Sequence, residues 1–210
     1  MKVIVQRVQS ASVAVNDSVI SSIGKGICVL VGIHDKDTPK ERETIVRKLL
    51  NLRVFEDEND KRWAKSVKDL NLEVLCVSQF TLYHTMKGNK PDFRHGNYYI
   101  IILDISDFIF WLNENTGSDK PIKFDFSSIF SAMTGEDAKE YYAQFLKDMM
   151  KNHPGGAEKI KNGQFGAMMQ VNIQNDGPVT LELEALPSLK DNEKATNSKS
   201  VSDDISATDG

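Results

Sequence analysis

The amino-terminal part of the chain alternates short β-branched or apolar runs with polar turn residues. Such runs, bounded by Asn, Asp or Gly, are typical of strands. Asn16-Asp17 separates two of them, and Gly24-Lys25-Gly26 predicts a hairpin turn rather than a phosphate loop, because no Gly-Lys-Ser or Gly-Lys-Thr follows it. We therefore predict strands over residues 3–8, 12–15, 19–23 and 27–32.

Two later segments carry apolar residues at the spacing of an amphipathic helix. The first begins with Thr38-Pro39-Lys40-Glu41, a capping box with proline at the first helical position. The second begins near Thr134. Their predicted apolar faces are Ile45, Val46, Leu49 and Leu50 for the first, and Ala138, Tyr141, Tyr142, Phe145, Leu146 and Met149 for the second.

The remaining periodic segments have strand character. Two of them flank the turn-like segment Asn175-Asp176-Gly177-Pro178. Strands therefore outnumber helices, which predicts a mixed α/β fold with much antiparallel pairing and two main helices. These further strands are predicted over residues 67–70, 73–79, 167–173 and 179–183.

Two segments do not fit this pattern. Residues 187–210 contain almost no large apolar side chain, which predicts a disordered polar tail. Residues 96–131 form a second irregular segment, which interrupts the predicted domain. Its apolar stretch, 98–112, is too short and too charged to span a membrane, because it contains Asp104 and Asp107. We predict one domain, 1–186, interrupted by 96–131.

Composition narrows the possible classes of protein. Apolar residues make up 40% and charged residues 27% of the chain, and the net charge is −4, which argues against a broad basic surface for nucleic acid. The amino terminus shows no secretory signal, so we expect a cytoplasmic protein. Cys28 and Cys76 lie in apolar runs and are predicted to be buried, reduced thiols.

Common catalytic and metal-binding motifs are absent from the sequence. It contains no Gly-x-Ser-x-Gly, His-Glu-x-x-His or Cys-x-x-Cys segment. The four histidines, His34, His84, His95 and His153, show no metal-ligand spacing and are predicted to lie on the surface or in loops. We therefore predict no metal site and no cofactor.

Three segments suggest chemistry rather than packing. Ser78-Gln79-Phe80-Thr81-Leu82 places polar groups at the end of a predicted strand, where binding sites often form. The basic segment 87–93 suits a phosphate, although a solvated turn would look the same. Asn175 to Thr180 contains a Gly-Pro pair, which is usually only a turn but can hold a cis peptide bond.

Taken together, these segments resemble the D-aminoacyl-tRNA deacylase family. The resemblance covers nearly all of 1–95 and 132–184, but neither 96–131 nor the tail. It implies a barrel-like, homodimeric enzyme that hydrolyses the ester between a D-amino acid, or glycine, and the terminal adenosine of tRNA. The matching segments are residues 1–8, 48–55, 78–82, 87–93, 163–169 and 175–180.

The resemblance also implies roles for individual residues. Ser78, Gln79, Phe80 and Thr81 would form the catalytic segment, with backbone N–H groups near Phe80-Thr81 as an oxyanion site. Thr81 could be a nucleophile, but no base lies beside it in sequence, so a positioning role is favoured, with the 2′-hydroxyl of the adenosine assisting the water. Lys87 and Lys90 would contact tRNA phosphates.

Rejection of L-amino acids requires a group that repels them. In the family, a cis Gly-Pro pair reaches into the active site of the other subunit, and here that pair is Gly177-Pro178. Glycine, which has no side chain, would still be accepted. The other substrate-binding residues implied are Asn175, Phe165, Gly166, Ala167 and Met168; Arg7 would support the Gly-Pro segment or the dimer, or would be only a strand-edge charge.

The irregular segment has an unusual explanation. Possible codons for Gly96-Asn97 contain a splice-donor sequence, and possible codons for Phe130-Ser131-Ala132 contain a splice-acceptor sequence. We therefore interpret 96–131 as a translated intron, with a species-specific loop as the alternative. Two other hypotheses stay open for function: an isoform inactivated by this segment, and a non-catalytic nucleic-acid-binding protein of the same fold.

Overall fold

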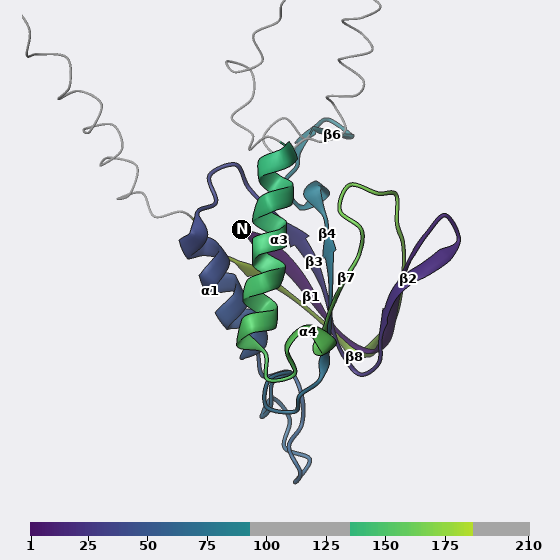
Figure 1. Cartoon of the computed structure of the whole chain (residues 1–210), viewed down its shortest axis with the longest axis vertical. Coiled ribbons are helices and arrows are strands. Elements are labelled where there is room, and N and C mark those ends of the chain that lie inside the picture. The colour runs from purple at the N-terminus through teal and green to yellow at the C-terminus, as the bar shows by residue number, and fades with distance from the viewer. Residues whose placement is uncertain (93–134, 187–210) are drawn as a thin grey trace, which may run out of the picture.

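One long strand organises the sheet of this computed structural model, which describes residues 1–92 and 135–186 (Figure 1). Strand β1 pairs antiparallel with β8 along one edge, and with β3 and then β2 along the other. Every residue from Ala11 to Ala14 therefore has neighbours on both sides. The bounds are β1 Lys2–Val15, β2 Ser18–Ile23, β3 Gly26–Gly32 and β8 Gln170–Glu184.

Two parallel pairings complete the six-stranded sheet. Strand β4 (Glu73–Ser78) lies parallel to β3, and β7 (Ile160–Asn162) lies parallel to β4. The sheet is nearly closed and barrel-like, and its other pairings are antiparallel, so the predicted mixed α/β class is confirmed. A separate hairpin consists of β5 (Thr85–Lys87) and β6 (Lys90–Asp92).

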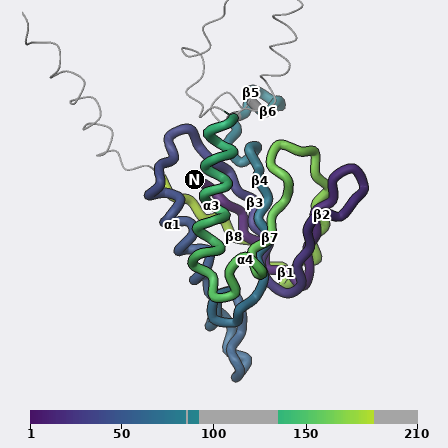
Figure 2. Tube along the Cα trace, viewed as in Figure 1, coloured from purple at the N-terminus to yellow at the C-terminus, as the bar shows by residue number. Residues whose placement is uncertain are grey.

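The helices cover one side of this sheet. Helix α1 (Pro39–Leu50) and helix α3 (Gly135–Asn152) lie side by side, as Figure 2 shows, and enclose the main apolar core. The capping box of α1 is present as predicted: the Thr38 side chain accepts from the Lys40 backbone, and Glu41 accepts from the Thr38 N–H. Within 1–92 and 135–186, no helix is both long and apolar enough to cross a membrane.

Three predictions about local structure were wrong. Residues 67–70 form a turn, not a strand, because Ser66 and Asp69 cap each other there. Gly24-Lys25-Gly26 does not join a hairpin, since β2 and β3 pair with β1 rather than with each other. Asn175–Pro178 does not separate two strands: it lies within the continuous β8, opposite a register shift in β1.

The two cysteines are buried and free, as predicted. They lie on opposite sides of the sheet, since Cys76 belongs to the main core and Cys28 to a second, smaller apolar cluster. Burial raises the pKa of the Cys28 thiol to about 12. Burial also raises the pKa of the Cys76 thiol, so both thiols are expected to stay protonated at neutral pH. The predicted segment 96–131 and the tail 187–210 lie outside the described residues.

His153 lies in a loop, which agrees with the prediction for the histidines, but its side chain is not exposed. It follows α3, its side chain is buried, and its Nδ1 accepts a hydrogen bond from the Gly155 backbone N–H at 3.1 Å. Short helix α4 (Gly156–Lys159) comes directly after this turn. An accepting Nδ1 requires a neutral ring, and burial lowers the pKa of His153.

We expect this buried histidine to make the fold less stable in mild acid. The folded-state pKa of His153 lies below the ordinary value of about 6.5. At pH values between these two pKa values, the unfolded chain therefore binds more protons than the folded chain. The free energy of unfolding should therefore fall as pH drops through this window, by at most about 1.4 kcal/mol per pH unit. Urea unfolding between pH 7.5 and 5 measures it. His153→Asn, whose oxygen can still accept from Gly155, should lose less stability; an equal loss would contradict the assignment.

Candidate active site

The predicted catalytic segment begins where β4 ends. The Gln79 N–H donates to the Val31 carbonyl at 2.7 Å, which extends the β3–β4 pairing by one residue and fixes the backbone beyond Ser78. The chain then forms a single 3₁₀ turn, η1 (Phe80–Leu82). The backbone of this segment is thus held against a buried parallel strand, as a positioned reactive group requires.

Among the residues that the structure describes, no general base is hydrogen-bonded to the Thr81 hydroxyl. Its hydroxyl accepts a hydrogen bond from the side-chain amide of Gln79, and an amide does not take up a proton at neutral pH. His84 contacts the Thr81 carbonyl instead, through Nδ1 at 2.8 Å. Thr81 is half-buried and does not line the cavity described next. This geometry agrees better with a positioning role than with a nucleophile.

A cavity of about 600 Å³ opens beside the end of β4. It brings together three parts of the chain that are far apart in sequence: the end of β4, the first turns of α3, and the loop between β7 and β8. Its lining residues are Val31, Ile33, Val77, Ser78, Gln79, Phe80, Gly135, Ala138, Phe165, Gly166, Ala167, Met168, Met169 and Val171.

The sequence predicted part of this lining and missed another part. Ser78, Gln79 and Phe80, and all four residues from Phe165 to Met168, line the cavity. Gly135 and Ala138 were not predicted to do so. Ala138 belonged to the predicted apolar face of the second helix, but the face does not tell which of its ends stays open to a cavity, and Gly135 lay outside that face.

The loop between β7 and β8 is anchored by its glycines. The Gly163 N–H donates to the Cys76 carbonyl at 2.9 Å, and a Cβ on Gly163 would lie 2.6 Å from Met169 Sδ. Gly166 has a φ of +75°, which favours glycine. Met168 is 90% exposed, so its side chain lies at the cavity mouth in open solvent.

No ionisable side chain lines the cavity among the residues that the structure describes. Its polar groups are the Ser78 hydroxyl, the Gln79 amide and the backbone. Within the same residues, no three His, Cys, Asp or Glu side chains are placed to hold a metal ion. Such a site can orient a substrate and polarise a carbonyl through N–H groups, but it offers no acid or base of its own.

The Gly177-Pro178 segment lies away from this cavity within one chain. Its peptide bond is cis, and Gly177 has a φ of +113°. Arg7 holds the preceding residue: its Nε contacts the Asp176 carboxylate at 3.1 Å and donates to the Asp176 carbonyl at 3.3 Å. Asn175, opposite Val8 in β1, does not line the cavity either. None of these residues contributes to the cavity of its own chain.

Arg7 is more than a strand-edge charge. Its Nη1 donates to the Val54 carbonyl at 2.6 Å, so that one guanidinium joins β1, the segment after α1 and the Gly-Pro segment of β8. The side chain is only 18% exposed. Of the three roles considered from sequence, support of the Gly-Pro segment is the one that these contacts favour.

Lys87 and Lys90 lie on the β5–β6 hairpin, which the sequence had not revealed as paired strands. Both side chains are exposed, on either side of a turn in which Gly88 has a φ of +60°. The hairpin follows η1 directly, so its cations come within a few residues of the catalytic segment. The order of the chain therefore places a basic hairpin next to the end of β4.

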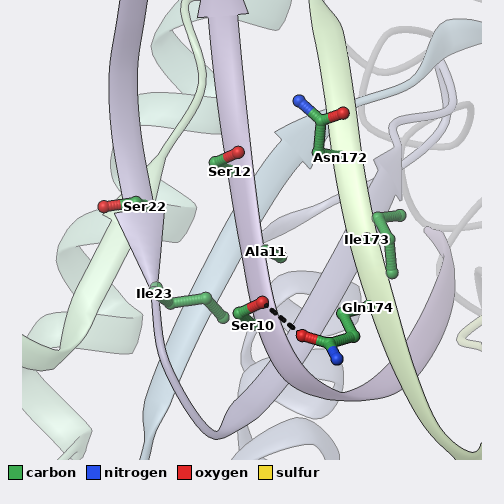
Figure 3. A pocket seen from close by; sticks show the side chains of 8 residues that line it. All are labelled: Ser10, Ala11, Ser12, Ser22, Ile23, Asn172, Ile173 and Gln174. Carbon is green, nitrogen blue, oxygen red and sulfur yellow. Dashed lines mark hydrogen bonds between the residues drawn. The ribbon is translucent and has the colours of Figure 1, made fainter.

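A second, shallower cavity of about 350 Å³ is lined by residues of β2, β1 and β8 (Figure 3). Serine hydroxyls and the amides of Asn172 and Gln174 surround it, and the Ser10 hydroxyl donates to Gln174 at 3.1 Å. None of the predicted site residues is among its lining residues. The cavity at the end of β4, which the candidate residues line, is therefore the better candidate for chemistry.

Comparison with known proteins shows the family to which the chain belongs. The profile of the family described as D-Tyr-tRNA(Tyr) deacylase matches residues 4–98 and 102–184. A Drosophila melanogaster D-aminoacyl-tRNA deacylase is 48% identical over 194 residues, 92% of this chain and 98% of its own. The Homo sapiens D-aminoacyl-tRNA deacylase 1 is 48% identical over 185 residues, 88% of this chain and 70% of its own.

Two solved structures share the fold. One, titled "c-Myc DNA Unwinding Element Binding Protein", has a TM-score of 0.68 at 47% identity and covers 89% of this chain and 100% of that one. The other, titled "Structural Analysis of a probable eukaryotic D-amino acid tRNA deacylase", has a TM-score of 0.53 at 17% identity, covers 88% of this chain and 98% of its own, and indicates the fold alone. On the evidence of its sequence, its fold and its cavity, the chain belongs to the D-Tyr-tRNA(Tyr) deacylase family of hydrolases.

Proposed function

We propose that this protein hydrolyses the ester of D-aminoacyl-tRNA, and of tRNA charged with glycine, releasing the free amino acid and tRNA. The observation that carries this proposal is the cavity at the end of β4, where Ser78–Phe80 meet Phe165–Met168 in a chain of the deacylase family. With tRNA as the substrate, we place the enzyme in the cytoplasm.

The proposed chemistry needs little from ionisable side chains. An aminoacyl ester is already reactive, so a site that holds it and polarises its carbonyl can leave the attack to water. The oxygen of water bonds to the carbonyl carbon, and the 3′-oxygen of the adenosine leaves with a proton. The proposed oxyanion donors are the backbone N–H groups of the Phe80-Thr81 turn, in which Phe80 lines the cavity. The neighbouring 2′-hydroxyl of the substrate would assist the water.

Selection against L-amino acids is proposed to need two copies of the chain. The Gly177-Pro178 segment is exposed and does not line the cavity of its own chain. In a homodimer that places the Gly177-Pro178 segment of each protomer against the cavity of the other, the backbone of this segment would occupy the space that an L side chain needs. Arg7 and Asp176 would hold it there through the contacts described above.

The decisive experiment compares the full chain with a form that lacks residues 96–131. Each is incubated with tRNA charged with a D-amino acid, its L-form or glycine, and release of amino acid is measured. Hydrolysis of the D-form by both supports the proposal. Hydrolysis by the shortened form alone identifies the full chain as an inactive isoform, and sequencing of transcripts across 96–131 then tests whether the segment is a translated intron.

A second candidate function has one observation in its favour. The solved structure at 47% identity is named for binding a DNA unwinding element. If neither form hydrolyses charged tRNA, this chain would be a non-catalytic nucleic-acid-binding protein of the same fold. Its net charge of −4 makes such a role depend on a local basic surface.

We expect the β5–β6 hairpin to bind tRNA through its cations. Removing two phosphate contacts with Lys87→Ala and Lys90→Ala should weaken tRNA binding and reduce the slope of log affinity against log salt by about 1.5. Filter binding at several salt concentrations measures both. Lys25→Ala with Lys68→Ala removes the same charge from exposed positions elsewhere and should leave the slope unchanged. An equal decrease in both double variants would show only an effect of net charge.

A further inference from the structure

Helix α3 contributes more than lining to the cavity. Gly135 and Ala138 line it directly, and Tyr142 follows one turn later on the same face of the helix. The Tyr142 side chain is buried, and its ring centroid lies 5.6 Å from that of Phe165, which forms part of the cavity wall. Tyr142 therefore contacts the wall from the side of the core.

A second aromatic ring supports this contact from behind. Phe145, which is fully buried, stacks on Tyr142 with ring centroids 6.2 Å apart and an angle of 25° between the ring planes. Tyr142 thus contacts both a fully buried ring and a ring of the cavity wall. Centroid distances of this size are those at which aromatic pairs attract beyond simple burial.

Phe165 depends on such support because of its place in the chain. It lies in a turn of the loop between β7 and β8, next to Gly166, and its side chain is only half-buried against the main core. The loop is attached through the Gly163 N–H on one side and enters β8 at Gln170 on the other. Between these points, packing of Phe165 on Tyr142 is a contact that ties the loop to α3.

The ring of Tyr142, rather than its hydroxyl, makes this contact. The hydroxyl oxygen is buried and has no hydrogen-bond partner among the described residues. Burial raises the pKa of Tyr142, so the hydroxyl stays neutral. A phenylalanine would keep the ring and remove a polar atom that gains nothing from its surroundings.

We propose that Tyr142 is a positioning residue that sets the Phe165 wall and thereby the affinity of the cavity for the aminoacyl end of its substrate. The proposal rests on the proposed function, in which this cavity takes the aminoacyl-adenosine end of tRNA. Tyr142 itself does not touch the substrate. Its effect is therefore on KM, whereas kcat, which depends on the Ser78–Thr81 segment, stays nearly constant.

Tyr141 provides a matched control. It is the neighbouring residue, equally aromatic and also buried, but it faces α1: its hydroxyl donates to the Thr38 carbonyl at 2.8 Å, and the Arg42 guanidinium lies 5.1 Å from its ring. Loss of this ring should lower stability without moving the cavity wall. A change in KM that follows Tyr142 but not Tyr141 separates positioning from stability.

The experiment measures steady-state kinetics and unfolding for Tyr142→Leu, Tyr142→Phe and Tyr141→Leu. We expect Tyr142→Leu to raise KM about tenfold with kcat within about twofold, and Tyr142→Phe to restore the KM of the unaltered protein. Tyr141→Leu should unfold more easily but keep KM. Equal KM changes in both leucine variants, or a raised KM in Tyr142→Phe, would overturn the proposal.

A double variant with Phe165→Leu tests the route of the effect. If Tyr142 acts through Phe165, the double variant should have the KM of the Phe165→Leu variant alone, whereas additive increases would contradict the proposal. Should the unaltered protein release no amino acid, the proposed function fails. Binding of a non-hydrolysable D-aminoacyl-adenosine amide to the same variants then decides the positioning role by itself.

Discussion

Replacing Gly177 with valine is expected to lower kcat/KM for D-aminoacyl-tRNA by about 100-fold, which corresponds to about 2.7 kcal/mol of transition-state stabilisation. Gly177 has a φ of +113°, a backbone conformation that L side chains rarely adopt. A Cβ there would also lie 3.0 Å from both Arg7 Nη2 and Val179 Cγ2. The backbone of the Gly-Pro segment would have to move, together with the surface that it presents to the neighbouring cavity in the proposed homodimer.

The measurement is hydrolysis of D- and L-aminoacyl-tRNA by the purified variant. Gly156→Val is the matched control, because Gly156 also has a positive φ, +55°, but no atom of the described residues lies within 4 Å of its Cβ position. It should cost some stability and leave kcat/KM unchanged. Unaltered rate and chiral selection in Gly177→Val would remove the Gly-Pro segment from the site.

Mixing variants can test whether the segment acts across subunits. A protomer with Gly177→Val keeps an intact cavity, and a protomer with Ala167→Trp, whose cavity is filled, keeps an intact Gly-Pro segment. If the site combines parts of two chains, the mixed dimers should regain activity that neither variant has alone. If dimers that are shown to be mixed regain no activity, each chain provides its own complete site.

The largest effect on stability is expected for Gly26→Ala, at the start of β3. A Cβ at this position would lie 1.9 Å from the Glu73 carbonyl oxygen and 2.8 Å from the Glu73 carbonyl carbon. Both belong to the backbone of β4, which pairs with β3 at this point, so the overlap cannot be relieved by turning a side chain. We expect a loss of more than about 4 kcal/mol, in the range that single substitutions rarely reach.

Urea unfolding followed by near-ultraviolet circular dichroism measures this loss. Gly24→Ala, two residues earlier, is the control: its nearest neighbour would be Glu73 Oε2 at 3.5 Å, an ordinary contact. It should leave stability within about 1 kcal/mol of the unaltered protein. If Gly26→Ala unfolds at the same urea concentration as the control, the close approach of β3 and β4 is not required.

Local sequence signals predicted the local elements well. The capping box at Thr38–Glu41 predicted the start of α1, because its hydrogen bonds join residues three apart and need no other part of the chain. The spacing of apolar residues likewise predicted which faces of α1 and α3 are buried. Such signals depend on short-range geometry, which a single sequence contains in full.

Long-range partners were where sequence-based prediction failed. Gly24-Lys25-Gly26 has the composition of a hairpin turn, but whether two strands pair with each other or with a third is decided by β1, which precedes both. Asn175–Pro178 has the composition of a turn, yet β1 holds both of its flanks in one strand. In the same way, motif residues predicted one side of the cavity, whereas its α3 side depends on packing between distant segments.

The placement of Gly177-Pro178 inside β8, rather than in a loop, limits how the protein can change. Loops usually accept extra residues, but the side chains of a strand alternate between its two faces. One residue gained or lost between Gln170 and Glu184 would exchange core-facing Val171, Ile173 or Leu181 with the solvent-facing residues beside them. Homologues of this protein should therefore keep the length of this strand unchanged even where the rest of their chains grow or shrink.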